Sequence, residues 1–194
     1  MIQLLVVANN RPEYLAKVEA SLAQFFTYDM FLLQDDVEHK GMAANIQAGW
    51  NLALEWPGWE YLFHIEDDMV LLERPPILAA CEALRTHPHV ANMIFQRQPW
   101  NDTERQAGGV HAAIAALAPN YIDHGTWGEH DHIFSLNPCL IPRRIVERGW
   151  PAGNEAEMTS KLLADGHTFG IWGTAKDKPL IDHIGVERGP GWKL

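Results

Sequence analysis

The stretch YLFHIEDDMVLL, residues 61–72, places three consecutive carboxylates between two apolar runs. Residues 61–65 have the apolar pattern of a buried strand, and Glu66, Asp67 and Asp68 follow where that strand ends. Adjacent carboxylates repel one another and resist burial, so a cation is their natural partner, and hard oxygen ligands suit Mg²⁺ or Mn²⁺. A solvated acidic turn is the alternative. Because apolar sequence flanks the triplet on both sides, a divalent metal site is favoured.

The sequence around this stretch alternates strand and helix patterns. Residues 2–8 and 30–34 are continuous apolar runs typical of buried strands, whereas residues 11–25 and a segment beginning at Gly41 have helical spacing. Residues 90–96 predict a further strand. This alternation predicts an α/β, Rossmann-like fold with a mainly parallel central sheet flanked by helices.

Polar residues follow each of the first three predicted strands. Asn9, Asn10 and Arg11 come after the first strand, Asp35 and Asp36 after the second, and the acidic triplet after the third. Ligands of such sheets bind beyond the carboxyl ends of the strands, so one crevice is expected to gather these side chains. Except for residues 112–117, residues 97–131 have no clear period and are rich in Gly, Asn, Asp and His, which predicts a functional loop or lid.

Composition narrows the class of protein. The 194 residues, of which 47% are apolar, predict one domain over residues 1–194, and the net charge of −10 argues against a generic polyanion binder. Cys81 and Cys139 are too few for a disulfide framework, which favours a reducing compartment. No window approaches the ~18 apolar residues of a membrane span, so a soluble, cytoplasmic protein without a membrane partner is expected.

Five blocks, in order, carry a family resemblance. Besides the EDD triplet they are VVANNRPEYLAKVEASL, KGMAANIQAGWNLAL, NEAEMTSKLLADG and DHIG. Together they resemble the opening strand and nucleotide loop, the Gly-and-Asn helix, the acceptor-side acidic helix and the C-terminal metal histidine of the GT-A-fold glycosyltransferases, especially family-2-type enzymes. The triplet resembles an EDD variant of their commoner D-x-D metal motif.

This resemblance implies a role for individual residues near the donor. Asp68 would bind a Mn²⁺ or Mg²⁺ ion that bridges the donor diphosphate, and His183 would be the second metal ligand. A structural histidine is the alternative for His183. Cofactor-binding positions would be Ala8, Asn10 and Arg11 in the nucleotide loop, Asp35 at the base, Glu66 at the ribose, and Asp67 beside it.

The same resemblance implies a catalytic base. Glu155 matches the position of the family's catalytic carboxylate, and Glu157 is the second candidate. A base is needed because the acceptor hydroxyl must lose its proton during an inverting transfer. The alternative is that acidic residues in a first helical turn only favour the helix dipole.

The implied function is transfer of a sugar from a nucleoside-diphosphate sugar, a UDP-sugar first, to an acceptor hydroxyl, with inversion expected. Residues 1–96 would bind the donor and residues 97–194 the acceptor. A saccharide is the first acceptor to consider, although the chain also resembles phage-encoded transferases that modify hydroxymethylated bases of DNA. Two other classes stay open: a nucleotidyltransferase, and a noncatalytic protein that binds sugar or nucleic acid.

Two further features bear on the acceptor. The segment HGTWGEHDHIF, residues 124–134, favours a polar loop lining the acceptor pocket, with a Zn or Fe site as the alternative. Trp100, Trp127 and Trp192 lie in polar, Gly-rich sequence, where an aromatic ring could stack on a sugar or a base. Ordinary packing is the alternative for each.

Overall fold

The computed structural model describes residues 1–26 and 31–185. Met30, the first residue of the predicted second strand, and Trp192 lie outside this part of the chain. No helix among the described residues is long and apolar enough to cross a membrane.

A central sheet of eight strands runs in the order β2-β1-β3-β8-β5-β9-β7-β6. Strand β1 pairs in parallel with β2 and β3, and β5 pairs in parallel with β9. Strand β8 is antiparallel to both β3 and β5, so β1, β2, β3, β5 and β9 all point the same way. The strands are β1 (Ile2–Ala8), β2 (Phe31–Asp35), β3 (Tyr61–Glu66), β5 (Val90–Phe95), β6 (Tyr121–Asp123), β7 (Trp127–His130), β8 (Cys139–Pro142) and β9 (Thr168–Trp172).

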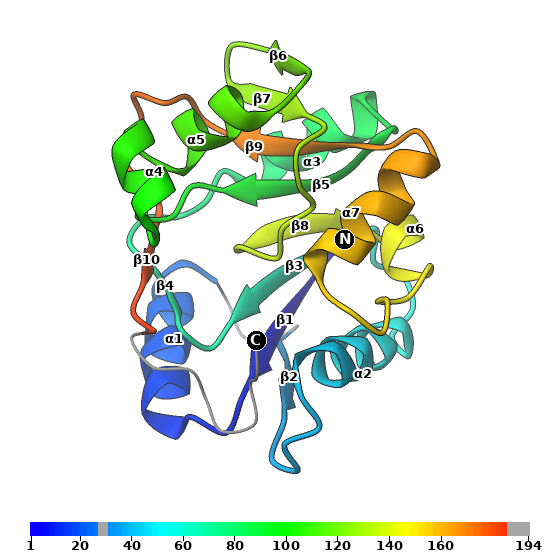
Figure 1. Cartoon of the computed structure of the whole chain (residues 1–194). Helices are drawn as coiled ribbons and strands as arrows, with labels where there is room; N and C mark the ends of the chain where they lie inside the picture. Colours follow the sequence, from blue (N-terminus) through cyan, green and yellow to red (C-terminus); the bar gives the residue numbers. More distant parts are fainter. Residues whose placement is uncertain (27–30, 186–194) are drawn as a thin grey trace.

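Helices cover both faces of this sheet, which confirms the predicted α/β class. Alternate residues of β1 belong to opposite cores: Leu5 and Val7 pack on one side, Leu4 and Val6 on the other. This burial of both faces explains why the first strand is a continuous apolar run. The first core includes α2 (Met42–Leu54), α5 (Val110–Leu117), α6 (Arg143–Val146) and α7 (Glu155–Ala164), and the second includes α1 (Pro12–Phe25) and α3 (Ile77–Thr86). Figure 1 shows α1 and α2 on opposite sides of the β1–β2 end.

A second, two-stranded sheet lies beside α1. It pairs β4 (Met69–Leu71) with β10 (Ile181–His183) in antiparallel register, so His183 lies opposite Met69 (Figure 1). The Ile184 N–H donates to the Asp68 carbonyl at 2.9 Å. This short ribbon therefore brings the end of the described chain to the acidic triplet, more than 100 residues away in sequence.

The prediction of a loop over residues 97–131 is wrong for most of that segment. It contains α4 (Asp102–Ala107), α5, β6 and β7. Helix α4 begins with a capping box. The side chain of Asn101 accepts the backbone N–H of Glu104, and the side chain of Glu104 accepts the backbone N–H of Asn101. Six residues without a buried side chain are too few to show a helical period, which is why α4 does not appear in the sequence pattern.

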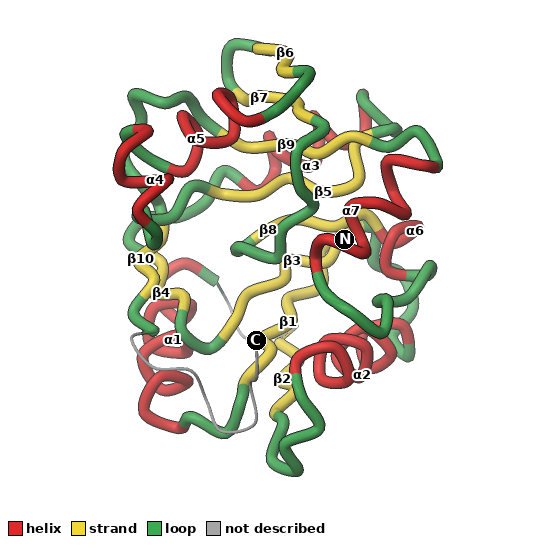
Figure 2. The backbone as a smooth tube through the Cα atoms, in the orientation of Figure 1, coloured by secondary structure: helices red, strands yellow, loops and turns green. Residues whose placement is uncertain are grey.

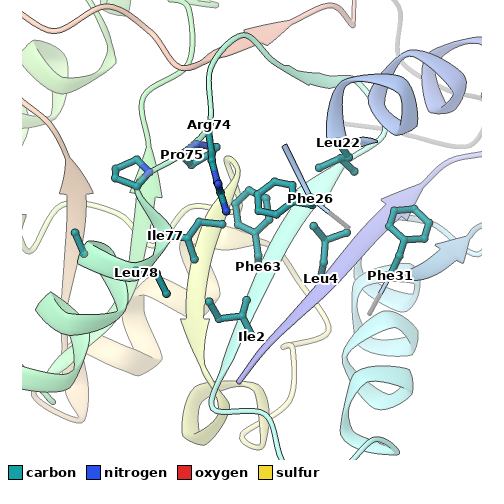
Figure 3. Close-up of a pocket in the computed structure, with 12 residues that line it drawn as sticks. Ile2, Leu4, Leu22, Phe26, Phe31, Phe63, Arg74, Pro75, Ile77 and Leu78 are labelled. Carbon is teal, nitrogen blue, oxygen red and sulfur yellow. The ribbon is translucent and has the colours of Figure 1, made fainter. Parts of the chain in front are cut away.

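An apolar cavity of about 610 Å³ lies between α1, α3 and the start of β1. Figure 3 shows Leu4, Phe26 and Phe63 among its walls, with Arg74 at its side. Among the described residues that line it, none carries a carboxylate or an imidazole.

Candidate active site

The loops after β1, β2 and β3 meet at one edge of the sheet, as predicted. The Asn10 N–H donates to Asp35 Oδ1 at 2.6 Å, and the Asn9 N–H donates to Asp67 Oδ2 at 3.0 Å. Asn10 has a φ of +53°, a left-handed conformation that Asn tolerates better than most residues. Figure 2 shows the loops after β1 and β2 at the lower side of the view and the loop after β3 above them on the left. The parallel strand ends thus deliver their polar residues to one place.

Arg11 binds two of the three carboxylates of the acidic triplet, Asp67 and Asp68. Its Nε donates to Asp67 Oδ2 at 3.2 Å, and its Nη2 reaches both Asp67 Oδ1 and Asp68 Oδ2, the latter at 2.9 Å. Burial alone would lower the pKa of Arg11, but the two carboxylates outweigh it and the pKa lies above its ordinary value. The guanidinium therefore stays charged. Asp67 is only 1% exposed, so it fixes Arg11 and the Asn9 backbone and is poorly placed for direct contact with a ligand.

Asp68 and His183, the two residues predicted to bind a metal ion, lie next to each other. His183 Nε2 lies 3.6 Å from Asp68 Oδ2. Burial raises the pKa of Asp68, but the neighbouring His183 and Arg11 outweigh this and the pKa lies below its ordinary value, so the carboxylate is charged. Gly185 packs against this carboxylate so tightly that a Cβ there would collide with Asp68 Oδ2.

The chemistry of these two residues fits a divalent cation. Asp68 Oδ1 and His183 Nδ1 are buried without a hydrogen-bond partner in the described chain, and buried polar atoms are rarely left so. Within residues 1–26 and 31–185, no group of three or more His, Cys, Asp or Glu could hold a metal ion. Two protein ligands suit a cation that takes its other ligands from a bound phosphate and from water, as Mg²⁺ commonly does.

Glu66 is a half-buried carboxylate at the end of β3. Burial raises its pKa well above the ordinary value, and the charges of Asp68 and Glu155 raise it further. In the described part of the chain its carboxylate has no hydrogen-bond partner, so it is available to a ligand as either a donor or an acceptor.

Glu155 is held at the start of α7, directly after the N-cap Asn154. Its Oε1 accepts the Leu136 N–H at 2.6 Å and the Ser135 hydroxyl at 3.1 Å. Burial raises the pKa of Glu155, although these two donors and Arg97 act in the opposite direction. Both donors bind Oε1, which leaves Oε2 without a partner among the described residues.

Glu157, two residues further on, has different surroundings. It is exposed and forms a salt bridge with Lys161 at 2.8 Å on the outer side of α7. The Lys161 hydrogen bond lowers the pKa of Glu157, which makes it a weaker base than Glu155. The geometry therefore favours Glu155 of the two predicted candidates.

Asp35 borders a hollow of about 180 Å³ at the β1–β2 end of the site, and Ala8 contacts Asn45 of its lining. Asn45 ties this corner together, because its side-chain amide donates to the Ala8 carbonyl at 2.7 Å and accepts from Gln34 at 3.1 Å. Asp35, Asp36 and Asn45 line the hollow. The hollow lies beside the Asn10 loop, since the Asn10 N–H donates to Asp35, and the binding of a nucleotide base there stays a prediction.

A buried ion pair beside the site was not predicted from the sequence. Arg97, which follows β5, forms two 2.8 Å hydrogen bonds with Glu104 and one with Asn137 Oδ1. Glu104 also accepts the Trp100 N–H, and the Trp100 ring lies 3.9 Å from the His183 ring between centroids. The rule that polar groups gather at carboxyl strand ends could have pointed to Arg97, because β5 runs parallel to β1.

The histidine-rich segment, residues 124–134, includes β7 and makes its side-chain contacts apart from Asp68 and His183. Glu129, on β7, accepts hydrogen bonds from His89 and His124 at 2.9 and 3.0 Å and from Thr168 at 2.8 Å. The ring of His124 stacks on Trp127 at 4.0 Å. These contacts join β7 to β9 and to the segment before β5, and the Zn or Fe alternative has no three-residue group in the described chain.

Comparisons with known proteins show the fold. No model of a known family matches the sequence, and no curated protein matches it. The chain is similar in structure to A197 from STIV, with a TM-score of 0.57 and 12% identity over 96% of this chain and 97% of that one. It is also similar to a mutant Drosophila β-1,4-galactosyltransferase 7 in complex with manganese, UDP-Gal and xylobiose, with a TM-score of 0.50 and 16% identity over 95% of this chain and 70% of that one. The fold is thus glycosyltransferase-like, as the resemblance implied.

Proposed function

We propose that this chain is a metal-dependent glycosyltransferase that moves a sugar, with inversion, from a nucleoside-diphosphate sugar to a hydroxyl of a saccharide. The observation that carries the proposal is that two carboxylates with different pKa values, Asp68 and Glu155, lie at the same edge of the sheet. Asp68 is charged and lies beside His183, whereas Glu155 is half-buried and its pKa is raised. Carboxylates whose environments separate their pKa values are suited to separate roles.

Asp68 and His183 would hold the cation through the Asp68 carboxylate and an imidazole nitrogen. A divalent cation bound there supplies charge neutralisation for the departing nucleoside diphosphate. Arg11 would contribute a further positive charge to the same phosphates, and the Asn10 loop would place the nucleotide over the hollow at Asp35. Glu66 would hydrogen-bond the ribose.

Glu155 would remove the proton from the acceptor hydroxyl. The Leu136 N–H and the Ser135 hydroxyl orient the carboxylate through Oε1, and Oε2 is left to receive the proton. Its raised pKa makes it a stronger base than an exposed glutamate, which suits general-base catalysis near neutral pH.

The donor and acceptor classes are proposed from the structural neighbour and from charge. The galactosyltransferase of similar fold was solved with manganese, UDP-Gal and xylobiose, which supports Mn²⁺, a UDP-sugar and a saccharide for this chain. A net charge of −10 disfavours a DNA acceptor. Residues 1–96 would form the donor part and residues 97–194 the acceptor part.

A thermal-shift screen tests the proposal. UDP, GDP, CDP and dTDP are compared with and without Mn²⁺, because a ligand that binds the native state raises its stability. The proposal expects stabilisation by a diphosphate that depends on Mn²⁺. Stabilisation by triphosphates alone would instead indicate nucleotidyl transfer, and no response to any nucleotide would indicate a noncatalytic binding protein.

A further inference from the structure

We propose that the guanidinium of Arg11 acts as an internal counter-ion of Asp68 and hinders the binding of a divalent cation there. The cation then binds Asp68 tightly only when a bound diphosphate replaces Asp68 as the anionic partner of Arg11. This inference rests on the proposed function and deepens it, because it specifies how metal and donor binding depend on each other. It concerns Arg11, Asp67 and Asp68, three residues that contact one another directly.

Arg11 and a divalent cation would compete for the carboxylate of Asp68. Arg11 Nη2 already lies 2.9 Å from Asp68 Oδ2, the oxygen that also faces His183. A divalent cation on Asp68 would come close to a guanidinium that is only 13% exposed, and like charges repel strongly where water is largely excluded. The cation and Arg11 in its present position therefore exclude each other.

Arg11 can move away from Asp68 and still stay in the site, because it also binds Asp67. Two of its three contacts to the triplet are with Asp67, through Nε and Nη2, and only one is with Asp68. Asp67 is itself fixed by the Asn9 N–H. A small shift of the guanidinium about Asp67 would free Asp68 Oδ2 while the charge of Arg11 stays paired.

A bound diphosphate would make the movement of Arg11 away from Asp68 favourable. A diphosphate presents several anionic oxygens, and the planar guanidinium binds such groups in a bidentate manner. A bound diphosphate would give Arg11 a replacement for Asp68 and would also offer ligands to the cation. Metal and nucleotide would then bind cooperatively, and each would raise the affinity for the other by the same factor.

Binding of Mn²⁺, measured by the loss of the free-ion EPR signal, tests this without any turnover. The wild-type protein, Arg11→Gln and the control Arg148→Gln are titrated with Mn²⁺ alone and with Mn²⁺ plus UDP. Arg148 pairs with Asp165 away from the site. UDP should tighten Mn²⁺ binding about 5–150-fold in the wild type and the control, the usual range of coupling between two sites. Arg11→Gln should bind Mn²⁺ alone at least about fivefold more tightly than the wild type, and UDP should tighten its Mn²⁺ binding by a smaller factor than in the wild type, because only the direct contact between diphosphate and cation then remains.

A second variant controls for misfolding, because Arg11→Gln leaves the buried carboxylate of Asp67 without the charged partner that Arg11 provides. The double variant Arg11→Gln/Asp67→Asn removes both charges and should also bind Mn²⁺ alone more tightly than Asp67→Asn does. Unchanged or weaker Mn²⁺ binding in both Arg11→Gln backgrounds, relative to their parents, would overturn the proposal. Failure of UDP to bind the wild type would overturn the proposed donor instead, while the titrations with Mn²⁺ alone would still decide the role of Arg11.

Discussion

Replacement of Glu155 by Gln separates the chemical role of this residue from its structural role. A Gln side chain keeps an oxygen for the Leu136 N–H and the Ser135 hydroxyl, which both bind Oε1 in the wild type. It cannot accept the acceptor proton. General-base catalysis contributes about 10²–10⁴-fold, so kcat should fall by that factor, or about 3–5 kcal/mol of barrier.

The stability of this variant should move in the opposite direction. Burial raises the pKa of Glu155 above its unfolded value, so the charged form is disfavoured in the native state and its ionisation costs stability as the pH rises. A neutral Gln escapes this cost, and the Tm of Glu155→Gln at pH 8 should equal or exceed that of the wild type. Glu155→Ala instead leaves a buried N–H unpaired, which costs about 1–3 kcal/mol or about 2–12 °C in Tm.

The assay compares initial rates of UDP release, with the donor and acceptor found by screening, and differential scanning calorimetry of the same samples. Glu157→Gln is the matched control, because it removes an exposed carboxylate from the same helix turn. Its rate should stay within about twofold of the wild type. Wild-type turnover by Glu155→Gln, or an equal loss in Glu157→Gln, would refute the assignment of the base.

Other predictions concern pH, the cation corner and the neighbouring ion pair. In the wild type, kcat/KM should rise with pH across a range above that of an ordinary carboxyl group, because Glu155 must lose its proton to act; a flat profile would contradict this. Asp68→Asn should abolish the Mn²⁺-dependent part of the thermal stabilisation by UDP, about 2.7 kcal/mol at a hundred times Kd. Gly185→Ala should weaken Mn²⁺ binding in an EPR titration, because its Cβ would displace the Asp68 carboxylate. Glu104→Gln should destabilise the fold by about 3–5 kcal/mol in urea unfolding, because it leaves Arg97 buried without a charged partner; a loss below about 1 kcal/mol would show that the pair is dispensable.

Periodicity predicted the fold where burial controls the pattern. The run of residues 2–8 is almost wholly apolar because β1 is covered on both faces, and the acidic helix that NEAEMTSKLLADG resembles is α7, which begins at Glu155. Helix α4 was missed because its stability comes from its capping box and from the Arg97–Glu104 pair, and neither leaves a hydrophobic period.

The candidate site was predictable in its location and less so in its contacts. Strand ends are local features, and parallel pairing brings them together, so Asp35 and Asp68 could be placed at one edge from sequence. The contacts of Arg11 with Asp67 and Asp68 join residues 56 and 57 positions apart, and His183 reaches Asp68 through the β4–β10 register. Side-chain pairing over such separations depends on the assembled fold, which no local pattern contains.

The most direct test of the whole account is the position of Mn²⁺ in a crystal grown with UDP and MnCl₂. Anomalous scattering near the manganese absorption edge locates the ion independently of any assumed chemistry. The account predicts a peak coordinated by Asp68 and His183 and bridged to the diphosphate of UDP. A peak at another place, or UDP bound with no ion at Asp68, would contradict it.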